Sequence, residues 1–153
     1  MRTVDVIVIR ASLDRVFQVA SDVERWPEIL SHYRWVRWLG RHDGGGRVEM
    51  AAWRPFGPLR YPTWWVSEMS VDRRGREIRY RHVRGITKGM DVVWRIAPVR
   101  EGRGAEVTVT HDWAGPAWPL VGALAANLVI GPIFIHGIAR RTLAGIKRCA
   151  EGA

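Results

Sequence analysis

The sequence predicts an α+β fold in which a curved antiparallel sheet of seven strands, two short helices and a long C-terminal helix enclose a cavity. Turn signals cut residues 33–113 into six extended segments, one strand-like segment and two helical patterns precede them, and a long helical pattern ends the chain. The 153 residues, 47% of them hydrophobic, suit one domain over 1–153 with its own core.

Short local patterns define the amino-terminal elements. Residues 3–10 are predicted as the first strand, and their short apolar run, interrupted by Asp5, lacks the hydrophobic core of a signal peptide. Ser12 is placed to cap a helix, and Asp22 to cap a second, short helix that carries Pro27 in its opening turns. The first helix is expected to turn a group of apolar residues inward: Val16, Phe17 and Ala20.

Six further strands follow from Tyr33 onward. They are separated by turn signals at residues 43–46, 55–58, 73–75, 84–85 and 102–104. Because side chains alternate between the two faces of a strand, one face of the sheet can be assigned as concave and mostly apolar. Its predicted members are Tyr61, Thr63, Trp65, Ser67 and Met69; Ile78, Tyr80 and His82; Met90, Val92, Trp94 and Ile96; and Val107, Val109, His111 and Trp113.

The last element is predicted as a helix from about 120 to 149 that closes the sheet and bends at Gly131-Pro132, because proline removes a backbone hydrogen bond. No charged side chain occurs from Trp113 to Ala139. Residues expected to face the sheet are Leu120, Leu124, Leu128, Ile135 and Ile138. The uncharged outer side suggests a homodimer or peripheral membrane contact through this helix; the alternatives are a bilayer span and a helix packed under the chain's own loops.

Composition limits the classes of partner. The net charge of +9 raises nucleic acid as a partner, but the arginines are spread over predicted strand edges and turns, with no recognition helix or RNA-binding signature. We therefore expect no nucleic-acid binding and interpret the charge as a solvated basic face that could attract anionic lipid or an acidic partner. Cys149 is the only cysteine, which fits a cytoplasmic protein.

The sequence motifs do not indicate a metal site or a cofactor-binding site. The five histidines show no paired helical spacing, and Gly44-Gly45-Gly46 links two strands, so a metal site and a phosphate cradle are not expected. Nine tryptophans exceed what a core of this size needs. Indole rings often line sites for flat, apolar ligands, so we expect a hydrophobic small molecule in the cavity.

Five fragments in register resemble the START-like polyketide aromatase/cyclase family, whose fold is the helix-grip. They are residues 22–30, Tyr33, residues 64–67, residues 90–94 and residues 141–147, and the resemblance covers nearly the whole chain. In that family, a pocket between sheet and helix holds a reactive poly-β-ketone and directs aldol ring closure and aromatisation. The resemblance implies that Trp26, Trp65 and Trp94 form aromatic walls and that Tyr33, Ser67 and His111 reach into the pocket as candidate catalytic groups.

One position departs from the family pattern. The family carries a catalytic arginine two residues beyond the serine, where this chain has Met69. Methionine offers soft apolar contact and no hydrogen bonds to a developing enolate. The candidates to replace the arginine are Arg54 on the neighbouring strand, and His82 or His111, whose imidazoles can take up and return protons near pH 6.5.

Two functions remain open from the sequence. The first is a polyketide cyclase, and the alternative is a non-catalytic carrier of a quinone or lipid, cytoplasmic in either case unless the C-terminal helix brings it to a membrane. Besides the three candidate catalytic residues, the predicted ligand-binding residues are Trp26, Trp35, Arg54, Trp65, Met69, Tyr80, His82, Met90, Trp94, Trp113, Leu128 and Ile135. No cofactor is expected.

Overall fold

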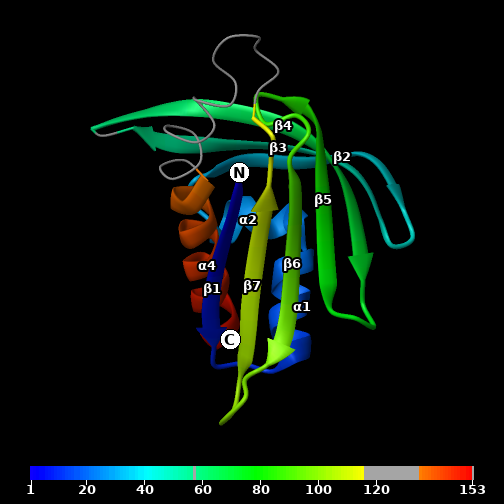
Figure 1. Ribbon diagram of the computed structural model, residues 1–153, viewed down its shortest axis with the longest axis vertical. Helices are drawn as coiled ribbons and strands as arrows, with labels where there is room; N and C mark the ends of the chain where they lie inside the picture. The colour runs from blue at the N-terminus through cyan, green and yellow to red at the C-terminus, as the bar shows by residue number, and fades with distance from the viewer. Residues whose placement is uncertain (57, 116–134, 153) are drawn as a thin grey trace.

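The computed structural model describes residues 1–56, 58–115 and 135–152. In chain order the elements are β1 (Arg2–Ile9), α1 (Leu13–Ser21), the 3-10 turn η1 (Val23–Arg25), α2 (Trp26–Ile29), β2 (Tyr33–His42), β3 (Gly45–Phe56), β4 (Leu59–Asp72), β5 (Glu77–Gly85), β6 (Asp91–Pro98), β7 (Ala105–Asp112) and α4 (His136–Glu151). The predicted seven strands, two short helices and C-terminal helix are confirmed (Figure 1).

All seven strands form one antiparallel sheet in the order β1-β7-β6-β5-β4-β3-β2. The predicted meander therefore runs from β2 to β7, and β1 joins its far edge beside β7. The β5–β6 ladder is short, pairing only Glu77–Arg81 with Asp91–Arg95. Figure 1 shows that β3 and β4 cross the top of the molecule while β5, β6 and β7 run down it, so the sheet is strongly curved.

The amino-terminal helices begin close to where the sequence predicts. Ser12 Oγ accepts a hydrogen bond from the Arg15 N–H at 3.1 Å, which confirms this residue as the cap of α1. Asp22 differs from the prediction, because it precedes the short turn η1 and its side chain makes no capping hydrogen bond. Pro27 occupies the first turn of α2, where the missing N–H has no intrahelical acceptor to lose.

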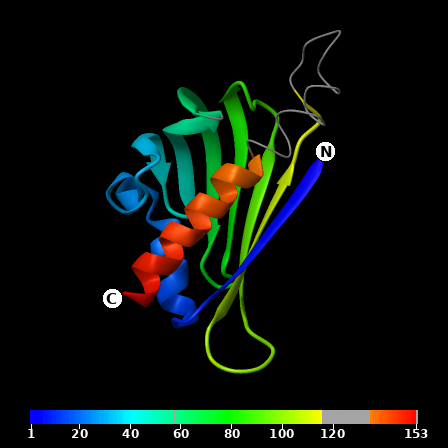
Figure 2. The same ribbon diagram turned by 90° about the vertical axis from the view of Figure 1, so that its left-hand side faces the viewer.

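Helix α4 lies across the concave face of the sheet (Figure 2). Its buried residues recur at helical spacing, which gives the helix one apolar face: Ala139, Thr142, Leu143, Ile146 and Ala150. Gly145 sits directly against the Leu30 side chain, so the absence of a side chain there lets α4 approach the end of α2 closely. The core lies between this helix layer and the sheet.

The described part of the C-terminal helix is shorter than the predicted span of 120–149. It runs from His136 to Glu151, and the predicted bend at Gly131-Pro132 and the inward position of Leu128 lie outside the described residues. Within the described ranges, no helix has both the length and the apolar character needed to cross a membrane.

Candidate functional site

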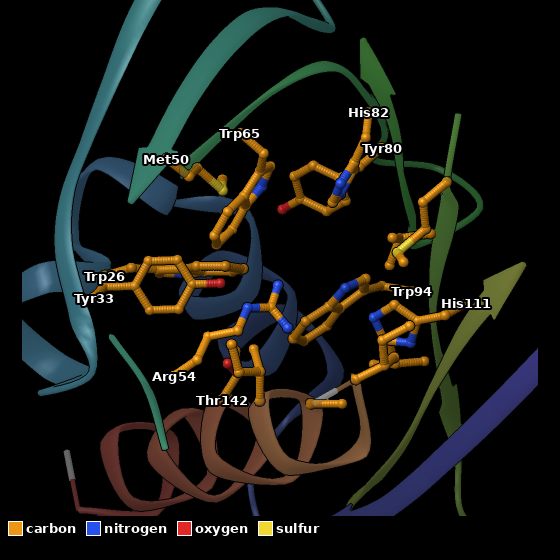
Figure 3. A pocket seen from close by; sticks show the side chains of 16 residues that line it. Trp26, Tyr33, Met50, Arg54, Trp65, Tyr80, His82, Trp94, His111 and Thr142 are labelled. Carbon is orange, nitrogen blue, oxygen red and sulfur yellow. The ribbon is translucent and has the colours of Figure 1, made fainter. Parts of the chain in front are cut away.

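A pocket lies between the concave face of the sheet and α4, and every strand from β2 to β7 contributes to its wall (Figure 3). The lining residues are Trp26, Tyr33, Met50, Arg54, Trp65, Tyr80, His82, Met90, Val92, Trp94, Val109, His111, Ile135, Ile138, Ala139 and Thr142. Most are apolar or aromatic, and none of these described residues is acidic. The pocket is therefore suited to an apolar ligand with a few polar atoms.

Three tryptophans line the pocket: Trp26, Trp65 and Trp94. Trp26 packs edge-on against Tyr33 with ring centroids 5.2 Å apart, and it lies 5.8 Å from the Trp94 ring. Tyr33 lies 6.1 Å from Trp65 in a second edge-on contact. The Trp26 indole N–H donates to the Val19 carbonyl at 3.3 Å, so this ring presents an apolar surface to the pocket.

Arg54 brings a positive charge into this apolar space. It is only 6% exposed, and its guanidinium carbon lies 5.8 Å from the centre of the Trp65 ring. Its Nε donates to Thr63 Oγ1 at 3.2 Å, and that hydroxyl donates to the Ala52 carbonyl at 3.0 Å. Figure 3 shows the guanidinium pointing to the centre of the pocket. The chain thus places a cation in the pocket from β3.

Tyr33 presents its hydroxyl to the same central space (Figure 3). Burial raises the pKa of Tyr33 to about 12, and a hydrogen bond with Thr142 and the charge of Arg54 oppose that rise. The phenol therefore stays protonated at neutral pH and can donate a hydrogen bond. Thr142 Oγ1 also lies 3.0 Å from His32 Nε2, which joins this side of the pocket to α4.

The two candidate histidines differ in their surroundings. His82 stacks on Trp65 with an interplanar angle of 9°, and its Nδ1 lies 2.7 Å from Thr87 Oγ1. His111 Nδ1 is buried and has no hydrogen-bond partner among the described residues. Burial lowers the pKa of His111 to about 4 and that of His82 to about 3, so both rings are neutral at pH 7. His82 thus uses one ring nitrogen within the protein, whereas His111 Nδ1 is an unsatisfied buried atom in the pocket wall.

Tyr80 adds a second phenol to the pocket. Its hydroxyl is buried without a hydrogen-bond partner in the described part of the chain, and burial raises its pKa well above the usual value. An unsatisfied buried hydroxyl costs free energy that a ligand oxygen could recover by accepting its hydrogen bond. Tyr80 and His111 thus each place a polar atom without a partner among the described residues in a mainly apolar wall.

Trp35 lies outside the pocket, which corrects the expectation for this residue. The β2–β3 register shifts between Tyr33 and Trp35, so two residues that would share a face in a regular strand point to opposite sides. Trp35 Nε1 donates to Glu49 Oε1 at 3.2 Å on the outer face of the sheet. The bulge thus keeps Tyr33 in the pocket and places Trp35 outside it.

Three further predicted residues are buried but do not line the pocket. Ser67 is fully buried and its Oγ has no partner in the described part of the chain, while its cross-strand neighbour His82 reaches the pocket instead. Met69 is buried beside Tyr80 in the β4–β5 ladder. Trp113 is 1% exposed and donates its indole N–H to the Lys88 carbonyl at 3.1 Å, so it fastens the end of β7 to the β5–β6 turn.

The pocket also contains residues that the sequence interpretation did not select. Met50 follows two positions after the fully buried Val48 on β3, so alternation could have found it. Ala139 and Thr142 follow Ile135 at helical spacing on α4, which is the signal that could have found them. Among the described residues, no cluster of histidine, cysteine or carboxylate side chains could hold a metal ion.

Comparison of the sequence with known proteins identifies a family. The family model described as "Polyketide cyclase / dehydrase and lipid transport" matches residues 9–131. Two Streptomyces proteins, each named "Putative polyketide cyclase", are similar to the chain. The one from Streptomyces halstedii is 36% identical over 98 residues, covering 63% of this chain and 87% of that protein. The one from Streptomyces cyaneus is 32% identical over 121 residues, covering 71% and 69%.

Solved structures share the fold over almost the full length. The Zhui aromatase/cyclase from Streptomyces sp. R1128 superposes with a TM-score of 0.81 at 19% identity, covering 99% of this chain and 93% of that one. The protein TTHA0849 from Thermus thermophilus gives 0.80 at 21% identity, covering 97% and 95%. A START superfamily protein from Mycobacterium smegmatis gives 0.73 at 14% identity, covering 99% and 97%. At these identities the likeness establishes the helix-grip fold.

Proposed function

The chain belongs to the polyketide cyclase/dehydrase and lipid transport family, and we propose that it binds an oxygenated, polyketide-like molecule in its pocket and catalyses aldol cyclisation with loss of water. The observation that carries this proposal is the position of Arg54. Its guanidinium and the Tyr33 hydroxyl point into one aromatic pocket that His111 also lines. The proposal treats residues 1–153 as one ligand-binding domain.

In this proposal, Arg54 supplies the positive charge that an arginine at the position of Met69 would otherwise supply. Removal of an α-proton from a β-ketone leaves an enolate, and its negative oxygen needs hydrogen-bond donors held in place before reaction. A guanidinium in a pocket with mostly apolar walls interacts with that charge more strongly than it would in water. Thr63 holds the Arg54 Nε at 3.2 Å, which fixes the direction of the guanidinium.

His111 is proposed as the group that moves protons. Its neutral ring accepts the α-proton, the enolate carbon attacks a second carbonyl, and the resulting alkoxide takes a proton from Tyr33 or from protonated His111. His111, neutral again after giving up its proton to the alkoxide or to the Tyr33 phenolate, then removes a second α-proton and returns it to the departing hydroxyl. The hydroxyl leaves as water and a carbon–carbon double bond forms. No electrons are gained or lost in these steps, so the sequence needs no redox cofactor.

A non-catalytic carrier is the second candidate function. It is favoured by the apolar character of most of the wall and by burial, which lowers the pKa of His111 to about 4 and so makes the imidazole a weak base. A carrier would use Trp26, Trp65 and Trp94 to enclose a quinone or lipid. The polar side chains of the pocket would then only form hydrogen bonds with the ligand's oxygens and would take no part in a reaction.

The two functions separate when Arg54 is replaced by methionine. We expect Arg54→Met to abolish formation of cyclised, dehydrated product from a reconstituted poly-β-ketone, followed by liquid chromatography and mass spectrometry, while binding of an apolar aromatic probe changes little. Arg47→Gln is the matched control, because Arg47 lies on the same strand and is exposed. If the wild-type protein does not change the mixture of products that forms spontaneously, the cyclase function is excluded and the carrier function remains.

A further inference from the structure

The outer face of the sheet carries a second gathering of aromatic side chains, on the side opposite the pocket. Trp35 on β2 and Trp64 on β4 both pair with Ala51 of β3, so they flank this small residue, which is fully buried between them. Trp53 lies two residues further along β3. Together with Arg34, Arg37 and Arg60, these tryptophans are called the tryptophan–arginine face below.

Each arginine of this face is held over an indole ring. The Arg34 guanidinium lies 4.8 Å from the centre of the Trp35 ring and 4.7 Å from that of Trp53. Arg60 lies 4.7 Å from Trp53, and Arg37 lies 5.2 Å from Trp35. Cation–π contacts of this kind hold the guanidinium groups close to the indole rings. A single partner can therefore contact the charges and the rings together.

The face is positively charged. Glu49 lies among these residues and is already engaged, since its Oε1 accepts from Arg37 Nε at 2.7 Å and from Trp35 Nε1 at 3.2 Å. Arg34 and Arg60 are exposed. Three guanidinium groups against one carboxylate leave a net positive surface, so its partner should be anionic.

Apolar groups are exposed beside these charges. Trp64 on β4 is 39% exposed on this face, and Trp35 and Trp53 are half-buried beside it. A single exposed apolar residue is normal on a surface, but Trp64 lies across Ala51 from Trp35, beside the indole rings and guanidinium groups of this face. The partner should therefore be both anionic and able to accept apolar side chains.

We propose that the tryptophan–arginine face docks on the surface of a bilayer that contains anionic lipids. Indole rings have an apolar body and one polar N–H, which places them favourably at the boundary between headgroups and acyl chains. Arginines beside them pair with lipid phosphates. An acidic protein or a nucleic acid would use the charges, but the exposed Trp64 ring among them favours a lipid surface.

This inference does not rest on catalysis in the pocket. Trp53 and Arg54 are neighbours on β3 and project to opposite faces, so the strand that carries the pocket cation also carries the docking face. Docking through this face would position the protein where apolar ligands dissolve. Failure of docking would leave the proposed function unaffected, because the assays measure different properties.

Vesicle binding by the full chain tests the proposal. Sedimentation with phosphatidylcholine vesicles, with and without phosphatidylglycerol, should show binding that needs the anionic lipid and weakens with added salt. Arg34→Gln with Arg60→Gln should weaken binding on the order of 30-fold, from two lost surface charges. Trp64→Ser should also weaken it. The control is Arg100→Gln with Arg103→Gln, which removes the same charge at the exposed β6–β7 turn.

The controls distinguish binding through this face from binding that depends only on the protein's net charge. Loss of binding in both arginine double variants to the same extent would assign it to net charge and overturn the proposal, as would wild-type protein that ignores anionic vesicles. Binding unaffected by Trp64→Ser and by the Arg34/Arg60 pair would place the contact on another surface and overturn it too. Face-dependent binding to polyglutamate or an oligonucleotide, without vesicle binding, would replace lipid with that partner.

Discussion

His136 Nδ1 lies 2.9 Å from Asp5 Oδ1 and 3.0 Å from Oδ2, so the first turn of α4 is tied to the edge strand β1. Because a carboxylate only accepts hydrogen bonds, Nδ1 carries the proton and donates it. Asp5 is buried, and Arg140 Nε lies 3.6 Å from the same carboxylate. The neighbouring residue Ile135 lines the pocket, so this contact fixes the start of the helix beside the ligand space.

Asp5→Asn should lower the free energy of unfolding by about 1–3 kcal/mol, since a buried charged hydrogen bond is replaced by a neutral one. Hydrogen exchange at the amides of residues 136–139 should accelerate more than at the end of α4. Asp14→Asn is the control, because Asp14 contacts Arg76 at an exposed site and should cost less than about 1 kcal/mol. Equal losses in both variants would contradict a special role for Asp5.

Acid should destabilise the protein through its buried histidines. Burial lowers the pKa of His32 to about 4, that of His82 to about 3 and that of His111 to about 4, against about 6.5 in the unfolded chain. Between these values the unfolded chain binds more protons, so the free energy of unfolding falls as pH decreases from about 6.5 to about 4.

His82→Gln should make that fall shallower, because one of the titrating groups is removed. Urea unfolding at a series of pH values between 4 and 7 measures the slope for each protein. His42→Gln, at an exposed position near the end of β2, serves as the control and should keep the wild-type slope. If the stability of His82→Gln depends on pH as steeply as that of the wild type, the claim that the His82 ring is buried and neutral is contradicted.

Gly85 and Gly89 provide a matched pair for the packing of the strand that holds Trp65. Both have a positive φ, +98° and +88°, so alanine strains the backbone at either site by about 1–2 kcal/mol. A Cβ at Gly85 would also overlap the Trp64 carbonyl and lie 3.0 Å from Trp65 Cα, whereas Gly89 has no heavy atom within 4 Å. Gly85→Ala should therefore cost about 1–3 kcal/mol more in chemical unfolding. Equal losses of stability in the two variants would mean that the backbone moves apart to make room for a Cβ at Gly85.

Trp94 should contribute directly to ligand affinity. Trp94→Ala removes one wall of the pocket and should weaken binding of an apolar aromatic probe by about 3 kcal/mol, measured by calorimetry. Tyr33→Phe keeps the ring and should change that affinity little, while reducing turnover if the phenol donates a proton. Trp64→Ala removes an outer-face indole and should leave affinity unchanged. A Trp94→Ala protein with wild-type affinity would place the ligand elsewhere.

The strands were predictable from the sequence because their signals are local. Turn residues and alternation gave all six strands from Tyr33 onward, and the inward faces of β5, β6 and β7 follow the alternation. The Tyr33–Trp35 bulge was not predictable, because it depends on pairing with β3 and leaves no local mark in the sequence. This is why Trp35 was expected in the pocket.

The site was predictable in part. Arg54 was one of several candidates to supply the missing cation, and its neighbours Thr63 and Trp65 show how the fold holds it there. Ser67 shows the limit of alternation, which gives the face of a strand but not which of the inward side chains is covered by larger neighbours. That depends on packing across strands.

The central claim is that Arg54 binds an oxygen of a ligand held between the aromatic walls. A crystal structure of the protein with a bound polyphenolic aromatic ligand tests it most directly. We predict that the ligand rings lie among Trp26, Trp65 and Trp94, with one oxygen within hydrogen-bond distance of the Arg54 guanidinium. A ligand that occupies this pocket with all its oxygens directed away from Arg54, or that binds outside the pocket, would contradict the account.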